Sequence, residues 1–312
     1  MSAEPRCVVV GGTGLVGHHV LRALRAAGLP ATGVARTPGP RDVGVVAGDV
    51  TAGTDALRRL LDGADVVVHA APYVGPDPDE SARVNVTGSR ALVAACTATG
   101  VDRLVYVSTA AVYGAGPHRD LSVDDGLPAP RSAVSRHRWH AETLVRSAGG
   151  LVVRPHLVVG VGDRHVVPPL ARFVTTLGAL PESADRTRCS VIGADDLGRL
   201  VAGLARHAVA SSSTWNAVPP TSVTTTALCA LATRALGDEL PRARLDAETV
   251  RRRALAAGFT ARQHDVVFGE RTYDPGDVWE AARVAPPRTT TLGDHAVRWY
   301  REHASDREPP SA

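Results

Sequence analysis

Three glycines that follow a short hydrophobic run are the first residues whose spacing suggests chemistry. The run RCVVV at 6–10 leads into GGTGLVG, in which Gly11, Gly14 and Gly17 recur every third residue. Between a strand and a helix, glycines at this spacing let backbone N–H groups approach a pyrophosphate at the helix N-terminus. The predicted pyrophosphate-binding residues are Gly11, Thr13, Gly14, Leu15, Val16 and Gly17.

The residue after the second hydrophobic run is expected to select the nucleotide. Ala31–Ala35 is followed by Arg36. An acidic side chain here would bind the adenosine 2′-hydroxyl, whereas a planar guanidinium suits a 2′-phosphate. We therefore expect NADP(H) rather than NAD(H), with an exposed arginine that binds nothing as the alternative. Asp49 and Val50 follow the third run and are expected at the adenine edge.

Hydroxyl and imidazole side chains farther along are candidates for proton transfer. Ser108, Thr109 and Tyr113 end or follow a β-branched run. His137 and His140 lie three residues apart, which can suit a metal, but no third ligand lies nearby in the sequence, so we expect no metal site.

Composition excludes lysine chemistry. All 35 residues counted as Lys+Arg are arginine, so neither a Schiff base nor a lysine acid or base is available. Asp195 and Asp196, taken alone, could act as a pair of catalytic carboxylates.

Alternating strand and helix patterns must position these residues. Helical patterns cover 79–99 and 132–148, the second beginning with SAVSRHRWHAE. Repeated βα units predict an α/β fold with a doubly wound parallel sheet, which binds ligands beyond the carboxyl ends of its strands. The expected strands are 6–10, 31–35, 43–47, 65–69, 103–108 and 151–154.

From about Val166 onward, prolines divide the chain into short helices and loops. We expect a nucleotide-binding domain at 1–165 with a returning segment near 189–215. A smaller substrate-binding cap is expected at 166–188 and 216–312.

Composition also limits the partners. The chain has 312 residues, 44% hydrophobic and 21% charged, and a net charge of +3 without a basic cluster, so we expect neither nucleic acid nor membrane as a partner. No signal peptide or membrane-spanning run is evident, and a cytoplasmic location is expected. Reduced, buried thiols are expected at Cys7, Cys96, Cys189 and Cys229.

In combination and in this order, the motifs resemble those of the extended short-chain dehydrogenase/reductase family. The resemblance implies a Rossmann domain followed by a C-terminal substrate domain. It rests on the segments 11–17, 48–50, 68–71, 85–88, 107–114, 154–155, 160–163 and 194–198.

The resemblance also implies roles for individual residues. Ala70 and Ala71 would line the cofactor, and Pro155 would pass the nicotinamide. Thr109 falls where the family keeps its catalytic Ser/Thr, and Asn85 falls in the helix behind the site. Asp195 and Asp196 become structural under this interpretation. The family's four-helix dimer seam would use the helices at 79–99 and 132–148, so a homodimer is an open expectation.

The sequence departs from the family at the residues that move the proton. The family's YxxxK motif is followed four residues later by a glutamate, which Glu142 matches. Counting back places Arg138 at the lysine position and Val134 at the tyrosine position. Arginine can still bind ribose hydroxyls, but valine cannot transfer a proton. Loss of general acid catalysis costs about 10²–10⁴ in rate, or roughly 3–5 kcal/mol.

Two replacements for the missing acid are possible. One is a side chain of the protein, with Tyr73, Tyr113, His137 and His156 as candidates. The other, which we favour, is a phenol on the substrate, whose pKa of ~10 matches that of tyrosine. Similar atypical ketoreductases occur in aromatic polyketide pathways. The catalytic candidates are Ser108, Thr109, Tyr113 and Arg138.

The expected function is therefore an NADPH-dependent reduction of a hydroxyaryl ketone. One alternative is a regulatory protein that senses NADP(H) without turnover. Another is an epimerase or dehydratase acting on a nucleotide sugar, although those reactions usually begin with the missing base.

Overall fold

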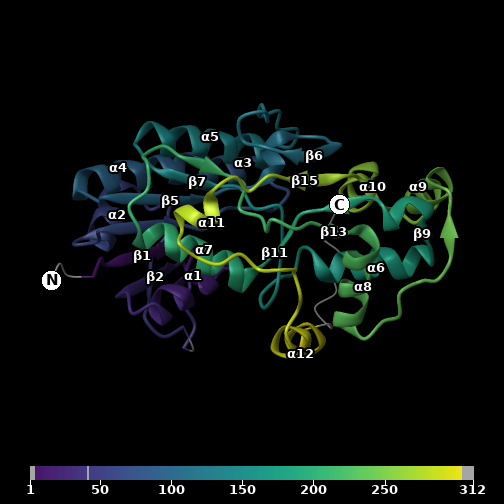
Figure 1. Cartoon of the computed structure of the whole chain (residues 1–312). Coiled ribbons are helices and arrows are strands. Elements are labelled where there is room, and N and C mark those ends of the chain that lie inside the picture. Colours follow the sequence, from purple (N-terminus) through teal and green to yellow (C-terminus); the bar gives the residue numbers. More distant parts are fainter. Residues whose placement is uncertain (1–3, 41, 304–312) are drawn as a thin grey trace.

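A parallel sheet of seven strands forms the centre of the computed structural model, which describes residues 4–40 and 42–303 (Figure 1). The strand order reverses beside β1, which pairs with β2 on one side and β4 on the other. The predicted fold class, a doubly wound parallel sheet, is thus confirmed. In spatial order the strands are β12 (Thr214–Trp215), β7 (Leu151–Val153), β5 (Arg103–Val107), β4 (Val66–His69), β1 (Cys7–Val10), β2 (Ala31–Ala35) and β3 (Val45–Ala47).

Helices cover both faces of this sheet, which explains why its strands are continuously apolar. In β1, Cys7 and Val9 pack against one helical layer, and Val8 and Val10 pack against the other. One layer contains α1 (Leu15–Ala26), α7 (Ala194–Arg206) and α11 (Val278–Ala281). The opposite layer contains α2 (Thr54–Leu61), α4 (Ser89–Thr99) and α5 (Ala133–Ser147).

A second lobe lies beyond the carboxyl ends of the central strands and has a hydrophobic core of its own (Figure 1). Its helices are α6 (Val167–Leu177), η3 (Glu182–Asp185), α8 (Thr225–Leu236), α9 (Ala247–Ala256), α10 (Ala261–Phe268) and α12 (Asp294–Glu302). Its paired strands are β8 (Leu157–Val159) with β11 (Val191–Gly193) and β9 (Leu180–Pro181) with β14 (Arg244–Leu245).

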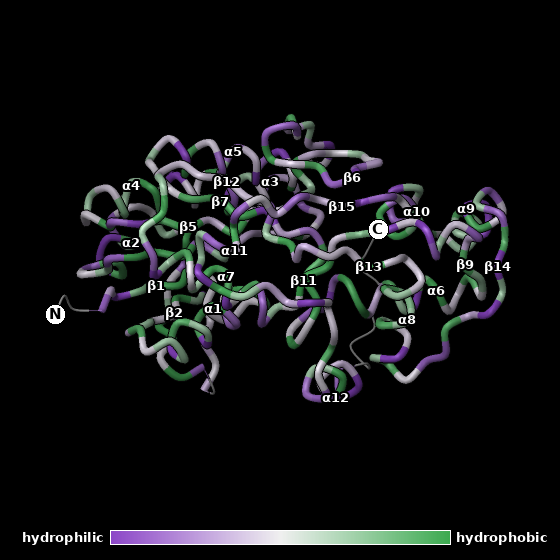
Figure 2. Tube along the Cα trace, viewed as in Figure 1, coloured by the Kyte–Doolittle hydropathy of each residue, from purple (hydrophilic) through white to green (hydrophobic). Residues whose placement is uncertain are grey.

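A four-stranded sheet lies between the central sheet and the outer helices of the second lobe (Figure 1). Figure 2 shows hydrophobic residues concentrated along the central strands, with more polar residues on the outer loops. No helix of the described residues is long and apolar enough to cross a bilayer. The strands of the four-stranded sheet, in order, are β13 (Val223–Thr224), β10 (Arg188–Cys189), β15 (Arg271–Tyr273) and β6 (His118–Leu121).

The helix predicted at 79–99 is divided into three parts. It begins as α3 (Pro78–Ala82), passes through a π-helical turn, η1 (Arg83–Gly88), and continues as α4. A π turn adds one residue to the helical period, so an amphipathic pattern does not reveal it. The helix predicted at 132–148 is α5, which begins with a capping box between Ser132 and Ser135.

Candidate cofactor and substrate site

The glycine turn after β1 is packed too closely for any side chain. Gly11 has a φ of +90°, and a Cβ there would lie 2.4 Å from the carbonyl oxygen of Ala70. A Cβ on Gly17 would lie 2.1 Å from the carbonyl oxygen of Gly11. Ala70 N also donates to the carbonyl of Val10, so the end of β4 lies against the turn. The structure thus brings Gly11, Gly17 and Ala70 together.

The first turn of α1 is open to an anion. Gly14 precedes the helix, and both Thr13 and Gly14 are exposed, while Leu15 and Val16 are half-buried. The first turn contains no acidic residue. Free N–H groups and the helix dipole therefore favour a negative group here.

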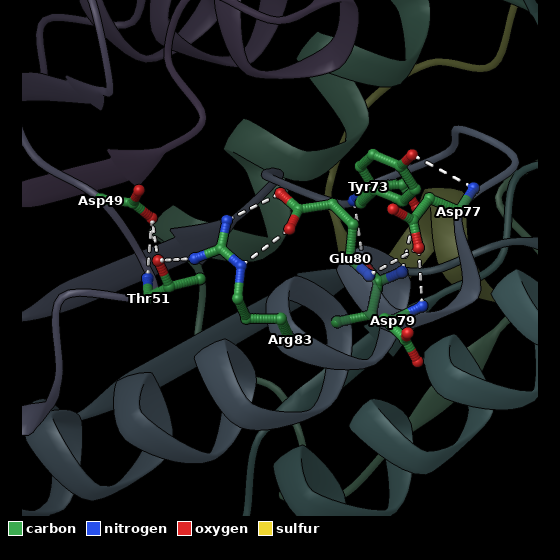
Figure 3. A network of polar contacts seen from close by, with 8 residues as sticks. Asp49, Thr51, Tyr73, Asp77, Asp79, Glu80 and Arg83 are labelled. Carbon is green, nitrogen blue, oxygen red and sulfur yellow. Dashed lines mark hydrogen bonds and ion pairs between the residues drawn. The ribbon is translucent and has the colours of Figure 1, made fainter.

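A polar network that the sequence did not reveal lies beside Asp49 (Figure 3). The Asp49 carboxylate accepts hydrogen bonds from the backbone N–H and the hydroxyl of Thr51, both at 2.8 Å. The Thr51 hydroxyl accepts one from Arg83 at 2.6 Å. Arg83 also forms a two-fold contact with Glu80, each N–O distance being 2.7 Å. No local pattern predicts this network, because it joins the loop after β3 to α3 and η1.

Arg36 is exposed, and its positive charge lowers the pKa values of two carboxyl groups in this network. Partial burial raises the pKa of Asp49, but hydrogen bonds from Thr51 and the charges of Arg83 and Arg36 lower it overall. The hydrogen bond from Arg83 is the main reason that the pKa of Glu80 is lowered, and Arg36 contributes. Arg36 therefore lies close enough to Asp49 and Glu80 for its charge to act on both carboxylates.

Asn85 fixes the loop that follows β4. Its amide oxygen accepts from Tyr73 N at 2.9 Å, and its Nδ2 donates to the Tyr73 carbonyl at 3.0 Å and to Ser81 Oγ at 3.1 Å. His137 Nδ1 lies 3.0 Å from the same Ser81 oxygen. The Tyr73 hydroxyl accepts from Asp77 N. Two of the side chains considered as replacement acids therefore already form hydrogen bonds within the protein: Tyr73 with Asp77, and His137 with Ser81.

Ser108 and Tyr113 belong to a buried hydrogen-bond network below the turn that contains Thr109. Ser108 Oγ donates to Glu142 at 2.5 Å, and Glu142 binds Arg154 at 2.6 Å. Arg154 also donates to the Tyr113 hydroxyl at 2.9 Å, which donates to Asn216 at 2.7 Å. Burial raises the pKa of Tyr113 despite the nearby Arg154 charge. Two of the three hydroxyls that were expected to be catalytic, those of Ser108 and Tyr113, are therefore occupied by hydrogen bonds to Glu142, Arg154 and Asn216.

Thr109 begins the 3₁₀ helix η2 (Ala110–Tyr113) and is partly exposed. Its hydroxyl accepts from the N–H of Ala111 at 3.2 Å, which leaves the hydroxyl proton available to another acceptor. The N–H of Ala110 donates to the carbonyl of Pro155 at 2.8 Å. This hydrogen bond brings the turn that contains Thr109 next to Pro155.

The two altered positions lie on the first turns of α5. Val134 is half-buried and has no polar group. Arg138 is 7% exposed, and one of its terminal nitrogens donates to the carbonyl of Val107 at 2.7 Å, at the end of β5. Arg138 Nε has no hydrogen-bond partner among the described residues. A buried, partly unsatisfied guanidinium is therefore available at the carboxyl edge of the sheet.

The histidines near this edge are neutral at ordinary pH. Burial, followed by the charge of Arg138, lowers the pKa of His69 to about 3. Burial, followed by the charges of Arg271 and His118, lowers the pKa of His156 to about 3. Burial also lowers the pKa of His137.

The adjacent aspartates at the start of α7 are held by surface ion pairs. Asp195 lies 2.7 Å from His19 Nδ1 and 3.5 Å from Arg22, both on α1. Asp196 lies 2.6 Å from Arg199. The contacts of Asp195 join α7 to α1, whereas that of Asp196 lies within α7. In the described part of the chain, no three His, Cys, Asp or Glu residues are grouped as a metal ion would require.

Known proteins share both the sequence pattern and the fold. Residues 7–213 match the model of the "NAD dependent epimerase/dehydratase family". A UDP-glucose 4-epimerase from Azospirillum brasilense is 35% identical over 160 residues, which are 47% of this chain and 46% of that protein. A 4-hydroxy-2-methyl-3-oxo-4-farnesyl-3,4-dihydroquinoline-1-oxide ketoreductase from Stigmatella aurantiaca is 30% identical over 186 residues, 55% of each chain.

The chain thus spans about half the length of the curated relatives that it matches. The structure of RMD from Pseudomonas aeruginosa complexed with NADPH superposes with a TM-score of 0.68 at 20% identity, covering 97% of this chain and all of that one. Because the family model covers more than half of the residues, the chain belongs to the NAD dependent epimerase/dehydratase family.

Proposed function

We propose that this protein is an NADPH-dependent ketoreductase whose substrate is a hydroxyaryl ketone of the aromatic polyketide type. The observation that carries the proposal is a cofactor-binding framework that lacks a proton donor at Val134. Two likenesses support it: the resemblance to the angucyclinone ketoreductase of simocyclinone biosynthesis, and the ketoreductase relative from Stigmatella aurantiaca.

The residues fit a nicotinamide dinucleotide. The glycine turn leaves no room for a Cβ at Gly11 or Gly17, and the unsatisfied Nε of Arg138 is a donor for a ribose hydroxyl. We assign Arg36 to the 2′-phosphate, and Asp49 and Val50 to the adenine edge. When bound, NADPH would supply the hydride that reduces the carbonyl carbon.

The substrate itself would supply the proton that the new alkoxide needs. We assign Thr109 as the donor of a hydrogen bond to the carbonyl oxygen; an aliphatic hydroxyl is too weak an acid to give up its proton. Since the pKa values of His69 and His156 are about 3, neither is in the imidazolium form at neutral pH, so neither can act as a general acid. A phenol next to the ketone can transfer its proton to the new alkoxide and become a phenolate, which later takes a proton from water. Ser108 and Tyr113 would then contribute by holding the turn that contains Thr109 in place.

Deuterium transfer tests the proposal directly. The purified protein is incubated with stereospecifically deuterated NADPH and a polycyclic ketone that carries an adjacent hydroxyl group. We expect deuterium at the carbinol carbon of the product. The matched substrate is the O-methyl ether of the same ketone, which should react about 10²–10⁴ more slowly. Tight NADPH binding without transfer to any phenolic ketone would contradict the proposal.

A nucleotide-sugar epimerase or dehydratase is the second candidate. The relative from Azospirillum brasilense, a UDP-glucose 4-epimerase, favours it. It must begin by oxidising an alcohol, for which Val134 supplies no base. Incubation with UDP-glucose, with release of UDP-galactose or a keto sugar as the readout, separates the two candidates.

A further inference from the structure

A group of aromatic and basic side chains lies just beyond Pro155, outside the machinery described above. Arg271 on β15 pairs in register with His118 on β6, and Tyr273 lies on the same face of β15, two residues later. The ring of His156 lies 5.1 Å from that of Tyr273, and the ring of His118 lies 5.6 Å from it. We call Arg271, His118, His156 and Tyr273 the Arg271 cluster.

The cluster adjoins the proposed reaction site. His156 directly follows Pro155, whose carbonyl accepts from Ala110, one residue after Thr109. Tyr113, at the end of η2, stacks on Tyr273 with 5.7 Å between the ring centres. The cluster is therefore close to the turn that contains Thr109.

Arg271 is a buried cation without a counterion. It is 7% exposed, and within the described residues its guanidinium forms neither an ion pair nor a hydrogen bond. Its buried NH1 approaches the backbone so closely that a Cβ on Gly116 would lie 2.1 Å from it. An unpaired buried charge is costly, so such groups are normally paired with an anion.

Two further polar atoms in the cluster lack partners. His118 Nε2 and His156 Nε2 are both buried and make no hydrogen bond to the described residues. Burial and the Arg271 charge lower the pKa of each histidine, and no carboxylate contributes to either shift. His118 and His156 are each half-buried, although the unpartnered nitrogens themselves are buried.

We propose that Arg271, with His118 and His156, binds a phenolate oxygen of the substrate. The proposal rests on the proposed function, because it names the group that would hold the phenolate formed during reduction. Arg271 can donate to an oxyanion, and each neutral histidine can do so in the tautomer that carries its proton on Nε2; a charged hydrogen bond from arginine is the strongest of such contacts. The rings of Tyr273 and the two histidines offer flat surfaces for an aryl group, which favours a phenolate over a carboxylate.

Binding of 4-nitrophenol, without cofactor, tests the cluster separately from turnover. Its absorbance reports ionisation, so a site of this kind should bind it saturably and promote its phenolate form. Arg271→Gln should weaken binding by about tenfold or more. The control is Arg119→Gln, an exposed arginine next to His118 on β6, which should leave binding unchanged.

Stability and competing ligands complete the test. Because Arg271 has no partner among the residues that the structure describes, Arg271→Gln should unfold at the same temperature as the wild type or a higher one. 4-Nitroanisole and benzoate should bind much more weakly than 4-nitrophenol. Equal binding of either, no saturable binding of 4-nitrophenol, or unchanged binding by Arg271→Gln overturns the proposal even if ketone reduction is observed. Conversely, Arg271-dependent binding of 4-nitrophenol without reduction of any ketone would support the cluster as a phenolate site and refute the proposed function.

Discussion

Glu142 and Arg154 form a two-fold ion pair whose side chains are 0% and 4% exposed. The pair joins α5 to the end of β7 and also holds Ser108 and Tyr113. It therefore fixes the turn that presents Thr109, although neither charged group is exposed to a substrate.

Replacement of Glu142 should destabilise the protein strongly. Glu142→Gln leaves the Arg154 charge buried without a counterion, which typically costs about 3–5 kcal/mol. Urea denaturation measures the change. The control is Asp55→Asn, which removes an exposed pair with Arg58 and should change stability by less than about 1 kcal/mol. A loss for Glu142→Gln as small as that of the control would contradict the assigned role.

The altered positions on α5 should respond differently to two substrates. If the substrate supplies the proton, the double variant Val134→Tyr, Arg138→Lys should raise kcat on a phenolic ketone less than about tenfold. On its O-methyl ether the same variant should recover part of the ~10²–10⁴ that a general acid provides. Steady-state rates with both ketones give the comparison. A large gain on the phenolic ketone would show that the native site lacks a functioning donor.

The glycine turn should tolerate no side chain. Gly17→Ala places a Cβ 2.1 Å from the Gly11 carbonyl oxygen, so backbone must move. We expect a loss of about 1–3 kcal/mol in stability and an NADPH affinity lower by about tenfold or more. Calorimetric titration measures the affinity. Gly293→Ala is the control, because its Cβ would meet nothing within 4 Å and its φ of −68° suits alanine.

Arg36 should determine the preference for NADPH. Arg36→Gln removes the cation assigned to the 2′-phosphate. It should weaken the binding of NADPH by about tenfold and leave the affinity for NADH nearly unchanged. Glu80→Gln removes a carboxylate whose negative charge opposes that of the 2′-phosphate, and it should strengthen the binding of NADPH. The dissociation constants of NADPH and NADH measure the effect. Equal losses of affinity for the two cofactors in Arg36→Gln would exclude this role.

Acid should destabilise the protein partly through His69. Its pKa in the fold is about 3, below the ordinary value of 6.5, because it is buried and lies near Arg138. The unfolded chain therefore binds the proton first, so this contribution to stability is present above pH 6.5 and is lost as the pH falls towards 3. The slope is about 1.4 kcal/mol per pH unit. His69→Gln should flatten the denaturation profile in this window, whereas the exposed His295→Gln should not.

The sequence was most informative where structure is local. Gly11 and Gly17 were predictable because a strand, a tight turn and a helix follow one another within a few residues. The Asp49–Thr51–Arg83–Glu80 network was not, because it joins two segments through a π turn that periodicity does not detect. Arg271 was missed for a related reason. Its strand has three residues, too few for a pattern, and its neighbours come from β6 and the end of β7.

The position of β12 has a consequence for how the molecule can be divided. This strand closes the edge of the central sheet, and α11 also packs on that sheet, although most residues between them and after them build the second lobe. The polypeptide is thus interleaved, and no single cut would separate the two hydrophobic interiors into intact pieces. We expect the halves to melt in a single cooperative transition, so that a molecule bound where they meet would protect the entire chain from proteolysis.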